Sequence, residues 1–191
     1  MTMGLENLNL GYHFDRNLHE VPDSLNDMRE AIRILESRLG QTTDDDEIME
    51  ILGSLANYCR ITRRLDEAEA YIMTAISRLG LPAIERRKQR NFVFRLRLAH
   101  IHHWEKRFDE SNHEFAAMVS EAESDPDLAP YLDFAYQHYG KNLFDQSRYE
   151  EAHAFFEKAL EIRRTSGRSR DLVKSSLLAK QETERRMHVH A

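Results

Sequence analysis

Residues 148–160 read RYEEAHAFFEKAL, and this stretch decides the fold because the chain repeats its pattern. The stretches RLDEAEAYIMTAI at residues 64–76 and RFDESNHEFAAMV at residues 107–119 have the same arrangement. Three positions recur with each stretch, at spacings of 12 and then 7 residues, and they hold small residues in most copies. The sets are Ala56, Ala68 and Ala75; Ala99, Ser111 and Met118; Gly140, Ala152 and Ala159. They are offset by 43 and then 41 residues, and a fixed period of this size predicts a stack of helical repeats.

The composition limits the classes of location and partner. The chain has 191 residues, of which 31% are charged and 41% hydrophobic, which argues against disorder. Its formal net charge of -6 disfavours nonspecific attraction to nucleic acid or to an anionic membrane. We therefore expect no nucleic-acid partner and no membrane partner. Cys59 is the single cysteine, which fits a reducing compartment. With no apolar leader and no long apolar stretch, the sequence predicts a cytoplasmic protein.

Apolar residues recur at three- and four-residue steps, which predicts helices with one apolar stripe each. We expect helices at residues 24–39, 44–61, 65–79, 83–104, 108–123, 127–146, 149–165 and 169–188. Gly80 and Pro82 predict the end of one helix and the start of the next. No segment alternates convincingly with a period of two, so we expect no sheet.

These helices are interpreted as one repeat domain that covers residues 1–191. Residues 1–23 are expected to be irregular because Gly11 and Pro22 interrupt them. The sequence Ser-Arg-Leu-Gly occurs at 37–40 and again at 77–80, so residues 24–39 are interpreted as a degenerate first repeat. Repeats are expected at 44–80, 83–123 and 127–166. The segment 169–188 is predicted to be a capping helix, which repeat arrays need at their ends.

The repeated residues resemble the tetratricopeptide repeat family. Leu55, Ala56 and Tyr58, followed by the motif at 64–69, carry this resemblance, and residues 149–160 form the clearest copy. The usual repeat has about 34 residues, so the longer units here resemble the kinesin-light-chain-like subgroup. The resemblance implies an all-α fold, namely a tetratricopeptide-like right-handed α-solenoid of antiparallel helix pairs with a concave groove.

Signals for catalysis or metal binding are weak. His100, His102 and His103 lie close together, but a metal site needs further ligands from another helix. Glu-x-x-His pairs at residues 110–113 and 150–153 match the spacing in diiron bundles, yet they are out of register with each other. We therefore expect no catalytic residues, no metal, no cofactor and no enzymatic activity.

A basic run opens the helix expected at 83–104. It consists of Arg86, Arg87, Lys88 and Arg90, followed by Arg95 and Arg97. Such runs are usually solvated helix faces, here balanced by acids at 44–47 and 121–127. The alternative is a surface that grips an anionic partner by bidentate contacts.

The resemblance implies that the first helix of each pair lines the concave groove. Applied residue by residue, it gives nine candidate partner-binding residues: Asn57, Arg60, Arg97, His100, His103, Trp104, Gln137, His138 and Lys141. The set mixes hydrogen-bond donors, positive charge and one large aromatic side chain. Such a mixture suits an extended peptide, and we expect the partner segment to be acidic or polar with an apolar anchor.

Three hypotheses about function remain open. The first is a noncatalytic adaptor or scaffold that binds a peptide or protein segment in its groove. The second is a self-associating structural module, a homodimer formed through the incomplete N-terminal repeat. The third is a small-ligand or signalling-peptide sensor, similar to the peptide-pheromone receptors of bacteria.

Overall fold

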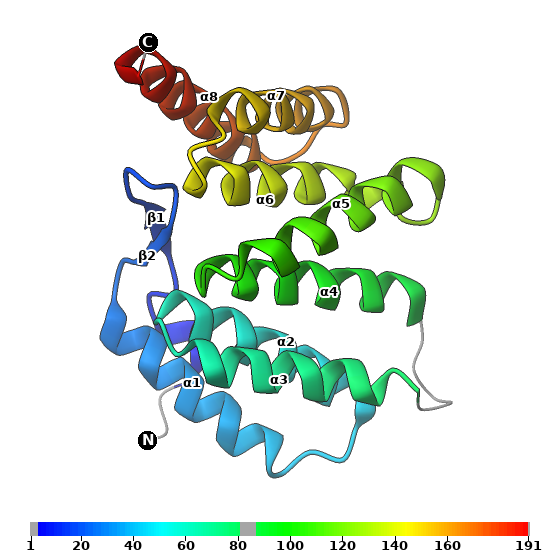
Figure 1. Ribbon diagram of the computed structural model, residues 1–191. Helices are drawn as coiled ribbons and strands as arrows, with labels where there is room; N and C mark the ends of the chain where they lie inside the picture. The colour runs from blue at the N-terminus through cyan, green and yellow to red at the C-terminus, as the bar shows by residue number, and fades with distance from the viewer. Residues whose placement is uncertain (1–3, 81–86, 191) are drawn as a thin grey trace. The chain divides into compact units, whose positions relative to one another are not determined.

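The computed structural model describes residues 4–80 and 87–190, and helices dominate them (Figure 1). The chain divides into two compact units. The first consists of Met1–Asp15 and His19–Glu105, and the second consists of Arg16–Leu18 and Lys106–Ala191. Each unit is an array of antiparallel helices, so the expected all-α solenoid fold is confirmed.

The described part of the first unit contains four α-helices and a short hairpin. Its elements are η1 (Leu5–Asn7), β1 (Tyr12–Phe14), β2 (Glu20–Pro22), α1 (Leu25–Leu39), α2 (Asp45–Ile61), α3 (Leu65–Arg78) and α4 (Arg87–Trp104). Ser24 and Asp44 cap α1 and α2, because their side chains accept hydrogen bonds from the backbone N–H groups of Asp27 and Glu47. The Pro82 turn and the start of the helix expected at 83 lie outside the described residues.

In the second unit the described residues likewise form four α-helices. Its elements are α5 (Phe108–Ser124), η2 (Ala129–Tyr131), α6 (Leu132–Asp145), α7 (Tyr149–Thr165) and α8 (Arg170–His190). The single helix expected at 127–146 is instead a 3-10 turn followed by α6, with Pro130 in the first turn of η2. The α8 helix packs against α7 and α6.

The expectation of no sheet is wrong. Strands β1 and β2 pair antiparallel, with Tyr12 opposite Pro22 and Phe14 opposite Glu20. Residues 1–23 are therefore not simply irregular, because their described part holds η1 and this hairpin. The strands have three residues each, which is too short to show alternation in sequence.

The repeated small residues make the helix crossings close. Ala68 and Ala75 of α3 are fully buried, as are Ala152 and Ala159 of α7. At Gly140 an added Cβ would lie 2.7 Å from Cε1 of Phe156, so the ring of α7 packs directly on the α6 backbone. These positions are small because larger side chains would separate the paired helices.

The same turn precedes α3, α5 and α7. In each case a residue with positive φ comes before an arginine that begins the helix without a side-chain cap: Arg63 and Arg64, Lys106 and Arg107, and Ser147 and Arg148. The arginine then pairs with a glutamate three positions later, as Arg148 Nε does with Glu151 Oε1 at 2.7 Å. This pairing lowers the pKa of the Glu151 carboxyl. Acidic residues in the first turn also suit the helix dipole.

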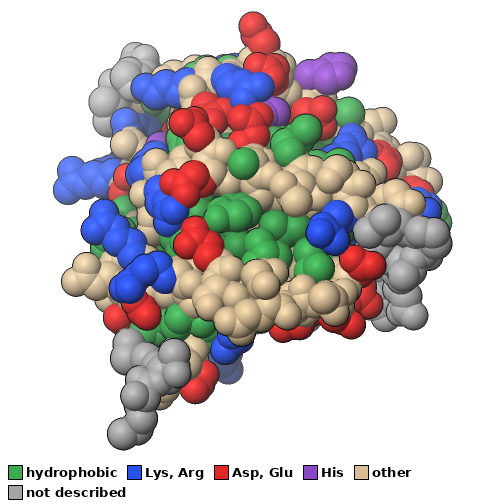
Figure 2. All heavy atoms as spheres, turned by 90° about the horizontal axis from the view of Figure 1, so that it is seen from below, with side chains coloured by type: hydrophobic (Ala, Val, Ile, Leu, Met, Phe, Trp, Pro, Cys, Tyr) green, Lys and Arg blue, Asp and Glu red, His purple; other side chains and the backbone are tan. Residues whose placement is uncertain are grey.

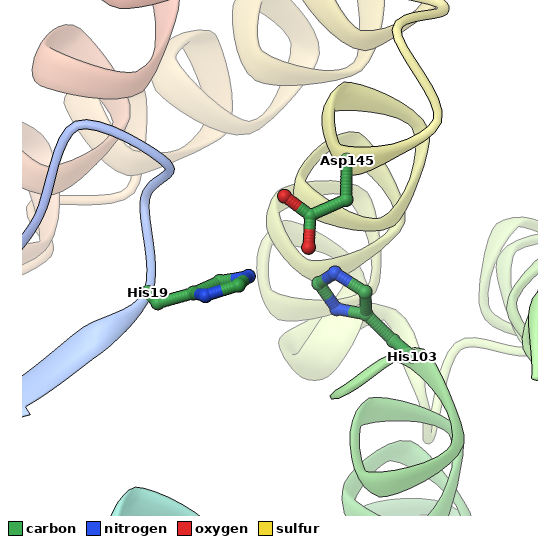
Figure 3. A group of neighbouring side chains, drawn as sticks. All are labelled: His19, His103 and Asp145. Carbon is green, nitrogen blue, oxygen red and sulfur yellow. The ribbon is translucent and has the colours of Figure 1, made fainter. Parts of the chain in front are cut away.

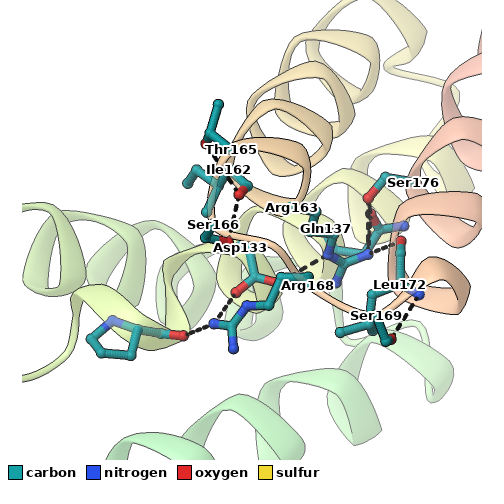
Figure 4. Close-up of polar contacts among 11 residues, drawn as sticks. Asp133, Gln137, Ile162, Arg163, Thr165, Ser166, Arg168, Ser169, Leu172 and Ser176 are labelled. Atoms are coloured by element: carbon teal, nitrogen blue, oxygen red, sulfur yellow. Dashed lines mark hydrogen bonds and ion pairs between the residues drawn. The ribbon is translucent and has the colours of Figure 1, made fainter.

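A buried polar network joins three helices of the second unit (Figure 4). Arg163 of α7 donates from Nε to Asp133 Oδ2 of α6 at 2.9 Å and from Nη1 to Ser176 Oγ of α8 at 2.8 Å. Arg168 donates to the other Asp133 oxygen at 2.9 Å. Because Asp133 and Ser176 are fully buried, these bonds fix how α6, α7 and α8 meet.

No described helix is both long and apolar enough to cross a membrane. On the face shown in Figure 2, hydrophobic side chains gather near the middle, and basic and acidic side chains surround them. Among the described residues on this face, acidic and basic side chains are interspersed.

Candidate functional site

The candidate site of the first unit is centred on Trp104, the last residue of α4. The guanidinium of Arg60 lies 4.5 Å from the Trp104 ring centroid, and that of Arg63 lies 4.0 Å from it. The imidazoles of His19 and His100 lie 5.1 and 5.9 Å from the same ring. Two cations therefore stack on one indole, and each such contact stabilises the cluster by about 0.5–2 kcal/mol.

The Trp104 side chain combines an apolar ring with one polar N–H group. Its side chain is 6% exposed, and its Nε1 has no hydrogen-bond acceptor among the described residues. A buried indole N–H usually finds a partner. The site therefore holds one unused donor beside its apolar ring.

Arg60 is already neutralised by the hairpin. Its Nη1 donates to Glu20 Oε2 at 2.9 Å, and both side chains are more than nine-tenths buried. Its Nη2 donates to Asn57 Oδ1 at 3.1 Å, one turn earlier on α2. The predicted residues Asn57 and Arg60 are thus hydrogen-bonded to each other, but Arg60 also pairs with a carboxylate from β2 that no local pattern predicts.

His19 brings the hairpin to the aromatic cluster as well. Arg63 Nη2 lies 3.1 Å from His19 Nδ1. Figure 3 shows the rings of His19 and His103, which meet edge to face with centroids 6.0 Å apart. His103 also stacks on His100 at 5.5 Å. Within the described part of the first unit, no group of three His, Cys, Asp or Glu ligand atoms converges here, so the unit by itself offers no complete metal site.

His102 does not belong to this cluster. Its Nε2 lies 3.2 Å from Glu69 Oε1 of α3. The three neighbouring histidines of α4 therefore separate, two toward Trp104 and one toward α3.

Arg97 lies one helical turn before His100 on α4. Its guanidinium rests on α2 at Gly53, where an added Cβ would overlap Arg97 Nη1 and approach Phe94 to 3.2 Å. Burial lowers the pKa of Arg97, and the nearby charge of Arg60 lowers it further. No carboxylate that the structure describes in the first unit pairs with it. In contrast, Arg90 on the same helix pairs with Asp46 at 2.5 Å.

The expected basic surface is only partly described. Arg86 lies outside the described residues, and Arg90 is engaged by Asp46. This engagement favours the interpretation of a balanced helix face over that of an anion grip for the start of α4. In the Glu-x-x-His pair at 150–153, His153 contacts another helix: its Nε2 lies 3.1 Å from Glu184 Oε1 of α8.

The other three candidates belong to α6 in the second unit. Gln137 is 2% exposed, and its Oε1 accepts hydrogen bonds from Arg163 and Ser176, so it serves the packing of α6, α7 and α8. Lys141 is buried and His138 is half-buried. Gln137 is committed to the buried network, and all three residues belong to the second unit. We therefore leave Gln137, His138 and Lys141 out of the site proposed below, which lies in the first unit.

Comparisons with known proteins support the repeat assignment. A tetratricopeptide repeat family model matches residues 135–168, which cover most of α6 and all of α7. This match supports assignment to the tetratricopeptide repeat family. No curated protein matches the chain.

The fold is similar to that of the crystal structure of Bacillus thuringiensis PlcR in complex with the peptide PapR7 and DNA. The TM-score is 0.71 at 15% sequence identity, and the likeness covers 86% of this chain and 58% of that chain. At this identity the likeness shows the fold alone. A fold of this type is typically a noncatalytic interaction module.

One expectation is corrected by this comparison. The exclusion of nucleic acid, which rested on the net charge of -6, is wrong, because a protein with this fold was crystallised with DNA. Net charge describes the whole chain, and it does not decide the partners that a fold accommodates.

Proposed function

We propose that the protein is a noncatalytic interaction module that binds a peptide or protein segment through the first unit. The proposed site consists of Asn57, Arg60, Arg97, His100, His103 and Trp104. The observation that carries the proposal is the cluster around Trp104. The guanidiniums of Arg60 and of Arg63, which was not predicted from the sequence, stack on its ring, and the His100 ring lies 5.9 Å from it. Cations beside an indole can bind an acidic or polar segment and hold an apolar anchor.

The likeness to a peptide complex supports a peptide as the ligand. PlcR was crystallised with the peptide PapR7, and by analogy the ligand proposed here is a peptide. We also propose that the long repeats place the chain near the kinesin-light-chain-like subgroup and that it works in the cytoplasm. A signalling-peptide sensor is one form of this function. Self-association through the N-terminal repeat stays an untested prediction.

Affinity capture from the source cells tests the proposal. The wild type is compared with the double variant Arg97→Gln/His103→Gln, and Arg90→Gln serves as a control that loses the same charge from the same helix. We expect a specific protein with the wild type and the control, and a reduction of about tenfold or more with the double variant. Thermal unfolding of the three proteins is measured in parallel. Equal capture by all three, or a loss that only follows unfolding, would contradict the proposal.

A further inference from the structure

Arg97 is the one arginine of the proposed site whose charge the first unit leaves without a described carboxylate. Arg60 has Glu20 at 2.9 Å, and Arg63 stacks on Trp104 and contacts His19. Arg97 has Arg60 as its charged neighbour, and that charge has the same sign. A half-buried cation without a carboxylate partner is costly. The position of Arg97, for which the described part of the first unit offers no such partner, therefore calls for an anionic ligand.

The backbone of α2 is shaped to hold this guanidinium. Gly53 lies in the interior of α2 and is buried. A glycine there lowers helix stability by about 1 kcal/mol relative to alanine. The gap that it leaves is filled by Arg97 Nη1, with the ring of Phe94 alongside. The glycine therefore positions the charged end of Arg97 against α2.

We infer that the guanidinium of Arg97, held against Gly53, is the docking point for a side-chain carboxylate of the bound segment. This inference rests on the proposed function and names the group that the site recognises. A guanidinium offers parallel N–H donors that match a carboxylate, and the pair is stronger where water is partly excluded. One uncompensated positive charge balances one carboxylate, whereas a phosphate carries about -1.5 to -2 at neutral pH.

The experiment titrates the full chain with N-acetylglutamate α-amide, whose single charge is the side-chain carboxylate. Backbone amide shifts of α2 around Gly53 report binding by NMR. Inorganic phosphate is titrated in a second arm. Three variants are compared with the wild type: Arg97→Gln removes the charge, Gly53→Ala keeps the charge but displaces it, and Arg90→Gln is the matched control.

We expect saturable shifts in the wild type and in Arg90→Gln, and binding weaker by about tenfold or more in Arg97→Gln and in Gly53→Ala. Gly53→Ala tests the position of the Arg97 guanidinium separately from its charge, because the added methyl would displace the flexible end of that side chain. Alanine also favours the helix, so α2 should stay intact. The fold of this variant is checked by thermal unfolding, which we expect to be unchanged or raised.

Several results would overturn the inference. Shifts that do not saturate, or binding that survives Arg97→Gln, would show that Arg97 is not the docking point. If Arg90→Gln weakened binding of the carboxylate as much as Arg97→Gln does, the loss would reflect the lower positive charge of the helix and not the position of Arg97. Tighter binding of phosphate than of the carboxylate would overturn the ligand class. If the titrations fail while partner capture still depends on the site, the carboxylate assignment is wrong and the proposed function stands.

Discussion

Replacing Arg163 with methionine is the perturbation of stability that the structure defines most sharply. The side chain is 1% exposed. Its guanidinium donates to Asp133 at 2.9 Å, to Ser176 at 2.8 Å and to the Leu172 carbonyl at 3.0 Å. Methionine has a similar length and is apolar, so it fills much of the volume but satisfies none of these acceptors.

The expected loss follows from what remains after the change. Removing one partner of a buried ion pair costs about 3–5 kcal/mol, because the other charge stays buried. Arg168 still donates to Asp133 at 2.9 Å, so we expect the lower end, about 3 kcal/mol. Total stabilities are about 5–15 kcal/mol. With a urea dependence of about 2 kcal/mol per molar, the midpoint falls by about 1.5 M.

Urea unfolding followed by circular dichroism measures this effect. The control is Arg164→Met, the exposed neighbour on α7, for which we expect a change within about 0.5 kcal/mol. Adding Asp133→Leu to Arg163→Met should restore part of the stability, because the buried carboxylate is then removed. If Arg163→Met unfolds at the same urea concentration as Arg164→Met, the network does not hold α6, α7 and α8 together as argued.

Three further predictions concern single positions. Burial raises the pKa of the Cys59 thiol to about 12, so a thiol reagent at pH 8 should label Cys59 only after denaturation; rapid labelling of the native protein would contradict this. Ser147 has a φ of 60°, so Ser147→Gly should stabilise the protein by about 1 kcal/mol in thermal unfolding, and Ser147→Ala should bring no such gain. Gly140→Ala would bring a Cβ to 2.7 Å from the fully buried ring of Phe156; we expect a net destabilisation of about 1–2 kcal/mol, and a raised melting temperature would refute the close crossing.

The helices could be predicted from the sequence because each repeats a local signal. The apolar stripe of α7 and the small residues Ala152 and Ala159 predicted its observed bounds, Tyr149–Thr165. The motif at 64–69 likewise predicted the start of α3 at Leu65. Periodicity depends only on residues close together in the sequence, so it can be recognised without knowledge of the tertiary structure.

The hairpin and the contacts that hold Arg60 and Arg97 in the site could not be predicted from local patterns. Glu20 reaches Arg60 across 40 residues of sequence, and no local pattern encodes that contact. Gly53 stood inside an expected helix, where an isolated glycine signals only a packing or functional reason without naming it. Its meaning depends on Arg97, which arrives from another helix. The repeat pattern assigned Gln137 to the groove side of its helix. The pattern could not indicate that Arg163 of α7 and Ser176 of α8 would donate hydrogen bonds to it.

Site-specific photo-cross-linking in the source cells is the most direct test of whether a partner binds at the proposed site of the first unit. A photoreactive residue is placed at Asn57, within the proposed site, and in a second protein at Met73, which is 51% exposed on α3. We expect a discrete adduct with one partner from position 57, which is lost when Arg97→Gln is added, and no such adduct from position 73. Equal adducts from both positions, or an adduct at 57 that persists without Arg97, would contradict this expectation.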